Sequence, residues 1–244
     1  MIYGSATDKG LIRSNNEDSF KVYSSNGEFP VVFILADGMG GHRKGELASR
    51  IAVDYAYEKI EESIAKTTTI QETTNLLVEI AERANVKVYL GALEDAENKG
   101  MGTTLTMAAI YENVLLIAHV GDCRAYLLRK NSLMRITVDH TLVQELVDSE
   151  NISQEQAMNH PKRHMLTRAL GVPTYMSADS YSVTLERADK ILLCSDGLHG
   201  FVSEQMIKSI LKRERNPAMA AQKLVAYANS TGGEDNVTVI AGYL

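Results

Sequence analysis

Hydrophobic and polar positions along the chain predict strands first, then two long helices, and then strands again. The short stretch 31–36 is apolar throughout, which is typical of a strand covered on both faces. Residues 46–65 and about 70–97 instead carry apolar side chains at roughly helical spacing, with charged residues between them. Both stretches therefore predict amphipathic helices, which follow each other directly after the first strands.

Beyond residue 100 the pattern returns to strands. Residues 103–107 and 114–117 predict a hairpin that turns at Glu112–Asn113, and a second predicted hairpin turns at Lys130–Asn131. The remaining predicted elements are strands at 181–185, 190–194 and 237–241 and helices at about 203–213 and 217–230. Strands, inserted helices and strands again predict an α+β fold, in which helices stack outside antiparallel sheets.

A polar stretch at 141–165 interrupts this pattern. Its helical pieces, around 142–147 and 153–157, predict an excursion from the core. The chain shows no internal repeat, low-complexity tract or linker, and it has only four prolines in 244 residues. We therefore predict one domain that spans residues 1–244.

Composition narrows the class of protein. The formal net charge of −6 argues against a nucleic-acid binder, because such domains usually carry a basic excess. No apolar run approaches the roughly 20 residues of a membrane helix, and the first residues (MIYGSATDKG) do not resemble a signal peptide. The two cysteines, Cys123 and Cys194, lie in apolar strand-like runs and predict buried packing in a reducing compartment. We expect a cytoplasmic protein without membrane insertion or nucleic-acid binding.

Four aspartates lie where apolar runs end or begin. Asp37, Asp122 and Asp196 each come just after such a run, and Asp235 comes just before the last one. Side chains at these positions lie at the rim of a sheet, so strands aligned side by side would bring the acids together. Several like charges in a small space require either protonation or a polyvalent cation between them.

A glycine accompanies each of these aspartates, as in the pair Asp37–Gly38. Asp-Gly is a common turn dipeptide, so a single copy indicates a turn more than a metal ligand. Recurrence at several apolar runs favours a metal cluster, in which exposed backbone would let a carbonyl approach the ion as well. Its ligands would all be oxygen, which favours Mg²⁺ or Mn²⁺ over zinc. Paired ions in such sites activate water toward phosphoryl centres.

The stretch RSNNED, from Arg13 to Asp18, is a second candidate element. Taken alone it is typical of a solvated turn. Arg13 offers a planar guanidinium that suits a phosphate dianion, and Glu17 and Asp18 add acid beside it. This stretch indicates a phosphate-binding site only in combination with the aspartates elsewhere in the chain.

Motifs along almost the whole chain resemble one enzyme family. The order RSNNED, ADGMGGH, GTTL, GDCRAY, VDH, LTRALG, CSDGL and GGEDNVT runs from Arg13 to Thr238. It resembles the metal-dependent protein phosphatase 2C family, and most closely its bacterial single-domain serine/threonine phosphatases. The resemblance implies a four-layer α-β-β-α sandwich, with two antiparallel sheets flanked by helix pairs. It also implies a phosphatase that acts on phosphorylated proteins, reverses a cognate Ser/Thr protein kinase and uses two Mn²⁺ or Mg²⁺ ions per chain. We expect a monomer.

The resemblance also implies a set of metal ligands. Asp37 would bridge the two ions, and the carbonyl of Gly38 would bind one of them. Asp196 and Asp235 would hold the other ion. Asp122 would help Asp196 to hold a third, weaker ion.

Further roles follow from the same resemblance. Glu17 and Asp18 would act at the metals mostly through bound water, Asn236 would steady that water network, and Arg13 would grip the substrate phosphate. A water held between the ions would attack phosphorus in line, without a covalent enzyme intermediate. The segment 141–165 matches a flap that varies within the family.

One position departs from the family pattern. Met39 stands where animal relatives have a histidine that is assigned as the leaving-group acid. His42, three residues further on, and a metal-bound water are alternatives for that role, and the sequence assigns neither. His42 is equally typical of a structural residue at the start of the next helix.

The sequence also allows two other functional classes and one narrower substrate class. Cys123 and Arg129 have the Cys-x5-Arg spacing of cysteine-dependent phosphatases, but the residues between them alternate like a strand and do not form the required small-residue loop. A catalytically silent phosphatase fold that serves as a binding module is the main alternative, although such modules typically lose acids that this chain retains. A phosphorylated anti-sigma antagonist is an alternative substrate for the same enzyme.

Overall fold

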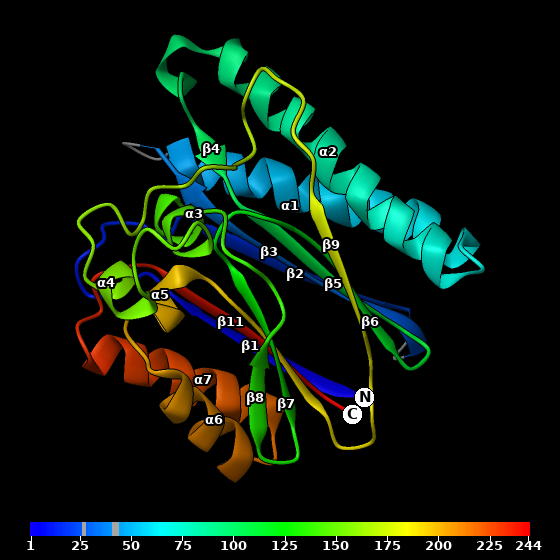
Figure 1. Cartoon of the computed structure of the whole chain (residues 1–244). Helices are drawn as coiled ribbons and strands as arrows, with labels where there is room; N and C mark the ends of the chain where they lie inside the picture. Colours follow the sequence, from blue (N-terminus) through cyan, green and yellow to red (C-terminus); the bar gives the residue numbers. More distant parts are fainter. Residues whose placement is uncertain (26–27, 41–43) are drawn as a thin grey trace.

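The computed structural model describes residues 1–25, 28–40 and 44–244, which form two antiparallel sheets packed face to face (Figure 1). The first sheet has the strand order β1 (Ile2–Asp8), β11 (Val237–Tyr243), β10 (Lys190–Cys194), β7 (Arg124–Arg129) and β8 (Ser132–Arg135). The second has the order β2 (Asp18–Ser25), β3 (Glu28–Met39), β5 (Leu105–Tyr111), β6 (Val114–Val120) and β9 (Asp179–Thr184), and the short β4 (Gly102–Thr103) pairs with β3. All of these pairings are antiparallel, as predicted.

Helices cover the outer faces of both sheets. The long α1 (Lys44–Ser63) and α2 (Ile70–Glu94) pack on the second sheet, and α6 (Glu204–Arg213) and α7 (Pro217–Ser230) pack on the first (Figure 1). The shorter helices are α3 (Leu142–Asp148), α4 (Gln154–Met158) and α5 (Asp196–His199), with 3₁₀ turns at Ile64–Lys66 and Ala96–Asn98. The predicted four-layer α-β-β-α sandwich is confirmed.

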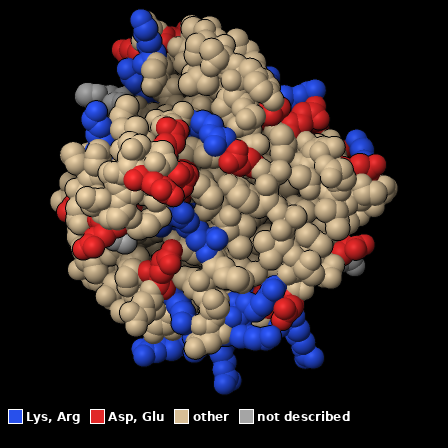
Figure 2. Space-filling view, in the orientation of Figure 1, with Lys and Arg blue, Asp and Glu red and all other residues tan. Residues whose placement is uncertain are grey.

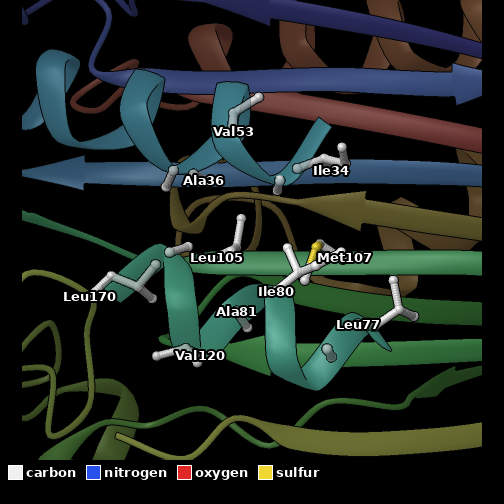
Figure 3. Close-up of a cluster of buried hydrophobic side chains, with 14 of the residues drawn as sticks. Ile34, Ala36, Val53, Leu77, Ile80, Ala81, Leu105, Met107, Val120 and Leu170 are labelled. Carbon is white, nitrogen blue, oxygen red and sulfur yellow. The ribbon is translucent and has the colours of Figure 1, made fainter. Parts of the chain in front are cut away.

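The apolar run in β3 is continuous because both faces of the strand are buried. Ile34 and Ala36 face α1 and α2, and Figure 3 shows them in the cluster that also contains Ile80 of α2. Phe33 and Leu35 point the other way, into the layer between the two sheets. Because side chains alternate along a strand, one apolar stretch supplies two separate cores.

Local signals fix the ends of several elements. Glu112 and Lys130, at the two predicted hairpin turns, have φ angles of 52° and 54°, and each sits between paired strands. The side chain of Thr69 accepts a hydrogen bond from the N–H of Glu72 and caps α2, and Asn216 caps α7 immediately before Pro217. These are the residue types preferred at helix starts.

The two ends of the sandwich differ in charge. Figure 2 shows basic side chains gathered at the end where α6 finishes and the β7–β8 hairpin turns. Lys212 of α6 reaches that hairpin, where its Nζ donates to Asn131 Oδ1 at 2.6 Å. The predicted acidic positions lie at the opposite ends of β7 and β10. In the described part of the chain, no helix has the length and hydrophobicity needed to span a membrane.

Candidate active site

The predicted acids gather where corresponding edges of the two sheets meet. In the second sheet, Asp18 and Asp37 are direct partners in the β2–β3 ladder, and Asp122 follows β6 at the same edge. In the first sheet, Asp196 follows β10 and Asp235 precedes β11, both at the same end of that antiparallel strand pair. A pocket of about 530 Å³ is lined by all of these aspartates except Asp18. The predicted convergence is therefore observed.

Asp18 links the two edges. Its Oδ2 accepts hydrogen bonds from Ser195 Oγ at 2.8 Å and Thr238 Oγ1 at 2.7 Å, both from the first sheet. Its Oδ1 is buried and has no hydrogen-bond partner among the described residues. A buried acceptor without a partner is costly, so this oxygen is suited to a water or an ion.

The backbone of Asp37 and Gly38 is held tightly. The N–H of Asp37 donates to Thr104 Oγ1 at 2.8 Å, and the N–H of Thr104 donates back to the Asp37 carbonyl at 2.9 Å. A Cβ at Gly38 would collide with the backbone of Gly45 and with the carbonyl of Glu17. Glycine is therefore required at position 38 by close backbone approach.

Mutual repulsion shapes the electrostatics of the cluster. Burial, followed by the negative charges of Asp18 and Asp196, holds the pKa of Asp37 well above its usual range. Burial raises the pKa of Asp18 to about 7, against the hydrogen bonds that it accepts. Burial and the charge of Asp196 also raise the pKa of Asp122. A cluster with these properties gains stability from any positive charge placed within it.

Two basic side chains already contact the cluster. Arg13 Nη2 donates to Asp235 Oδ2 at 2.9 Å, with the arginine side chain half exposed. His164 Nδ1 lies 3.3 Å from Asp196 Oδ2. Burial alone would raise the pKa of Asp196, but the hydrogen bond with His164 and the neighbouring histidines lower it. The pKa of Asp235 is raised by burial and by Asp196 despite Arg13.

The arrangement of the acids and of the two basic side chains that contact them determines whether the pocket can bind a metal ion. Across residues 1–25, 28–40 and 44–244, no three acidic, histidine or cysteine side chains surround a common point closely enough to ligate an ion in the arrangement seen. The residues nevertheless fit a hard divalent cation, because the donors are carboxylate oxygens, burial and mutual repulsion raise the pKa values of Asp37, Asp122 and Asp235, and Asp18 Oδ1 lacks a partner among the described residues. Arg13 and His164 contact Oδ2 of Asp235 and Asp196, so a cation bound at these oxygens would compete with both contacts.

Asn236 fixes the RSNNED stretch beside the acids. Its Nδ2 donates to the carbonyls of Lys9 and Asn15, both at 2.9 Å, and its Oδ1 accepts from the N–H of Glu17 at 2.8 Å. The Glu17 carbonyl in turn accepts from the N–H of Gly38 at 3.1 Å. Asn236 and Glu17 thus line the same pocket as the aspartates, and their predicted role in a water network stays a prediction.

The cysteine-based hypothesis is wrong. Cys123 is buried, and burial together with the charge of Asp37 holds its pKa well above the usual range. Arg129 lies at the other end of β7, where its Nη2 donates to Asp189 Oδ2 at 2.7 Å. The two residues therefore cannot share a phosphate. Cys194 is buried as well, which confirms the predicted packing role of both cysteines.

The structure adds pocket residues that sequence reasoning missed. Arg163 and His164, from the segment 141–165, line the pocket together with Met39. A single histidine in a polar stretch carries no signal of its own, and only the fold brings His164 to Asp196. His42, an alternative for the leaving-group acid, lies outside the described residues.

Comparison with known proteins decides the family. The family model described as protein phosphatase 2C matches residues 12–228. The chain belongs to the protein phosphatase 2C family. Its similarity to the serine/threonine phosphatase Stp of Listeria welshimeri reaches 44% identity over 234 residues, which are 96% of this chain and 92% of that protein.

Solved structures of protein phosphatase 2C enzymes agree. The serine/threonine phosphatase of S. agalactiae matches with a TM-score of 0.91 and 33% identity, and the match covers 98% of this chain and 97% of that one. The catalytic domain of the serine/threonine protein phosphatase PstP, in complex with two manganese ions, matches with a TM-score of 0.84 and 34% identity over 99% and 97% of the two chains. The chain is a serine/threonine protein phosphatase of the bacterial branch.

Proposed function

We propose that this phosphatase removes phosphate from phosphoserine and phosphothreonine of proteins with two bound Mn²⁺ or Mg²⁺ ions, and that it accepts a third ion more weakly. The observation that carries the proposal is the convergence of Asp37, Asp196 and Asp235 from two sheets on one pocket. The PstP domain, which shares the fold, was crystallised with two manganese ions, and this supports manganese as one usable ion.

The candidate ligands divide between the two sheets. From the second sheet, Asp37 and the carbonyl of Gly38 would hold metal, and from the first, Asp196 and Asp235. Asp122, in the connection from β6 of the second sheet to β7 of the first, would share the third ion with Asp196. Bound divalent ions supply an activated water and neutralise negative charge on the phosphoryl group.

Arg13 is the proposed phosphate-binding residue. Its guanidinium is half exposed at the pocket and donates to Asp235. Because an arginine fork bonds phosphate and carboxylate in the same way, a substrate phosphate can replace the carboxylate as its partner. Glu17 lines the pocket and is an acceptor that can orient water there, and Asp18 Oδ1 is a buried acceptor without a partner among the described residues.

Residues 141–165 are the proposed flap, the segment that varies within the family. Arg163 and His164 reach the pocket from this segment, so its position determines which groups face a bound phosphoprotein. Met39 cannot donate the leaving-group proton, so His42 and a metal-bound water stay the two alternatives for that role.

The non-enzymatic alternative is a binding module with the same fold. The acid positions of the family pattern are all filled, and all of them except Asp18 line one pocket, which favours catalysis. The test is hydrolysis of p-nitrophenyl phosphate and of a phosphothreonine peptide over a range of Mn²⁺ concentrations. We expect turnover that a chelator abolishes and iodoacetamide leaves intact. Absence of turnover at every Mn²⁺ concentration would support the binding module.

Phosphorylated proteins are the proposed substrates, and a Ser/Thr protein kinase is the proposed functional counterpart. A cytoplasmic location and a monomeric state remain predictions. Comparison of phosphoproteomes with and without the gene identifies the substrates, and an anti-sigma antagonist among them would support that narrower alternative.

Replacing Arg13 tests its proposed contact with phosphate. Arg13→Ala is expected to lower kcat/KM for a phosphopeptide by about 10- to 100-fold, mostly through a higher KM, because a charge-assisted hydrogen bond contributes about 1.5–3 kcal/mol. Arg13→Lys should retain part of this binding. Steady-state kinetics at saturating Mn²⁺ measure both variants, and an unchanged KM in Arg13→Ala would contradict the assignment.

Limited proteolysis tests whether the segment 141–165 responds to metal. We expect faster cleavage within it in the metal-free protein than in the Mn²⁺-loaded protein, because bound ions would neutralise the repelling carboxylates of the pocket that Arg163 and His164 line. Cleavage sites are identified by mass spectrometry. Equal cleavage rates in the two states would argue against the coupling.

A further inference from the structure

The turn that carries Asp122 has a backbone conformation that requires glycine. Gly121 has a φ of 110°, and a Cβ at this position would collide with Thr104. His140 bonds Gly121 twice: the N–H of Gly121 donates to His140 Nδ1 at 3.1 Å, and the N–H of His140 donates to the Gly121 carbonyl at 2.8 Å. One side of the turn is therefore fixed by His140.

His199 holds the other side of the turn. Its Nε2 lies 3.0 Å from the carbonyl oxygen of Asp122. A carbonyl only accepts hydrogen bonds, so Nε2 carries a proton and donates it. His199 is the last residue of α5, the short helix that begins at Asp196. The hydrogen bond thus joins the turn of one proposed ligand to the helix of another.

The helix α5 provides a fixed base for this contact. A Cβ at Gly197 would collide with the Asn236 carbonyl, so α5 lies directly against the start of β11. The N–H of Gly200 closes the helix on the Asp196 carbonyl at 2.7 Å. The ladder pair Cys194–Arg124 joins β10 to β7 two residues from each aspartate, and the His199 hydrogen bond is the contact that joins α5 directly to the Asp122 carbonyl.

We propose that His199 is a positioning residue that sets the spacing between Asp122 and Asp196 and thereby the affinity of the weaker divalent-cation site. This inference rests on the proposed function, because it takes these two aspartates as the ligands of the third ion. Residues that orient metal ligands from outside the coordination sphere typically change metal affinity by about 10- to 100-fold when replaced. The contact is made by backbone and imidazole, so it leaves both carboxylates free for the ion.

The test is calorimetric titration of the metal-free protein with Mn²⁺ alone. His199→Phe keeps a planar ring without a donor, and His199→Gln keeps an amide N–H near the position of Nε2. We expect His199→Phe to weaken the weakest Mn²⁺ site by about 10- to 100-fold while the tighter sites are unchanged. His199→Gln should restore most of the affinity. Asp122→Asn identifies the site, because the same binding step should be lost in that variant.

His160→Phe is the matched control, since His160 lies in the segment 141–165 and its Nδ1 accepts only from the N–H of Lys162 among the described residues. It should bind Mn²⁺ like the wild type. If His199→Phe does not fold, His199→Ala serves the same comparison. Unchanged weak-site affinity in His199→Phe or His199→Ala, or a defect in His199→Gln as large as in His199→Phe, would overturn the inference while the proposed function stands. A wild-type protein that binds no Mn²⁺ would overturn both.

Discussion

Asp37→Asn is expected to abolish phosphoester hydrolysis and, at the same time, to stabilise the metal-free protein. Activity should fall by about 100-fold or more, equivalent to about 2.7 kcal/mol of transition-state stabilisation, because a proposed ligand of the metals is lost. Stability should rise because the substitution removes one negative charge from a buried cluster in which Asp18 and Asp196 repel it. Thermal unfolding in chelator should show an increase of about 2–4 °C for each 1 kcal/mol gained.

The stabilising effect of Asp37→Asn should depend on pH with a definite sign. The pKa of Asp37 is raised in the folded state, so between its unfolded value of about 3.9 and the raised value the folded protein binds more protons than the unfolded one. Wild-type stability without metal therefore falls as pH rises through this range. The variant lacks this loss, so its advantage should grow with pH. Asp54→Asn, at an exposed surface position, is the control and should change neither property. A metal-free Asp37→Asn protein less stable than wild type at high pH would contradict the repulsion argument.

Breaking the ion pair between Arg124 and Asp139 is expected to have the largest effect on stability. Arg124 Nη2 donates to Asp139 Oδ2 at 2.6 Å and its Nε bonds both carboxylate oxygens, with both side chains largely buried. Arg124→Met leaves Asp139 as a buried charge whose remaining cation, Arg135, is 3.6 Å away. Removal of one partner of such a pair costs about 3–5 kcal/mol. The melting temperature should fall by about 6–20 °C, at 2–4 °C per kcal/mol.

Three comparisons isolate the pair. The double variant Arg124→Met with Asp139→Leu should recover most of the stability, because no unpaired charge remains. Arg83→Ala, which breaks the exposed pair with Glu79, should cost less than about 1 kcal/mol. Burial would raise the pKa of Asp139, but Arg124 lowers it, so the pair stabilises the protein above about pH 4 and loses its effect as pH falls below that. The difference in stability between wild type and Arg124→Met should therefore become smaller as pH falls below about 4. A difference that stays constant with pH would contradict the stabilising role of the Arg124–Asp139 pair.

Most of the architecture could be predicted from hydrophobic periodicity because its central elements are buried. The strand β3 and the helices α1 and α2 have long, regular apolar patterns, and the hairpin turns are marked by short polar breaks. The strands β1 and β2 were missed because they are only partly buried and mix polar with apolar residues. The four-residue α5 was missed because it is too short to show a period.

The acids of the site could be predicted, but their partners could not. Asp37 and Asp196 are recognisable because each ends an apolar run. The contacts Arg13–Asp235 and His164–Asp196 join residues far apart in the chain, and no local pattern indicates them. The contact of His199 could not be predicted either, because a lone histidine in a sequence gives no sign that it bonds a particular backbone carbonyl.

Anomalous diffraction from crystals grown with Mn²⁺ tests the central claim most directly. We expect two strong manganese peaks in the pocket, with oxygen atoms of Asp37, Asp196 and Asp235 among their ligands and Arg13 released from Asp235. Peaks that contact residues of only one sheet, or an Arg13–Asp235 pair that stays intact at saturating Mn²⁺, would contradict it.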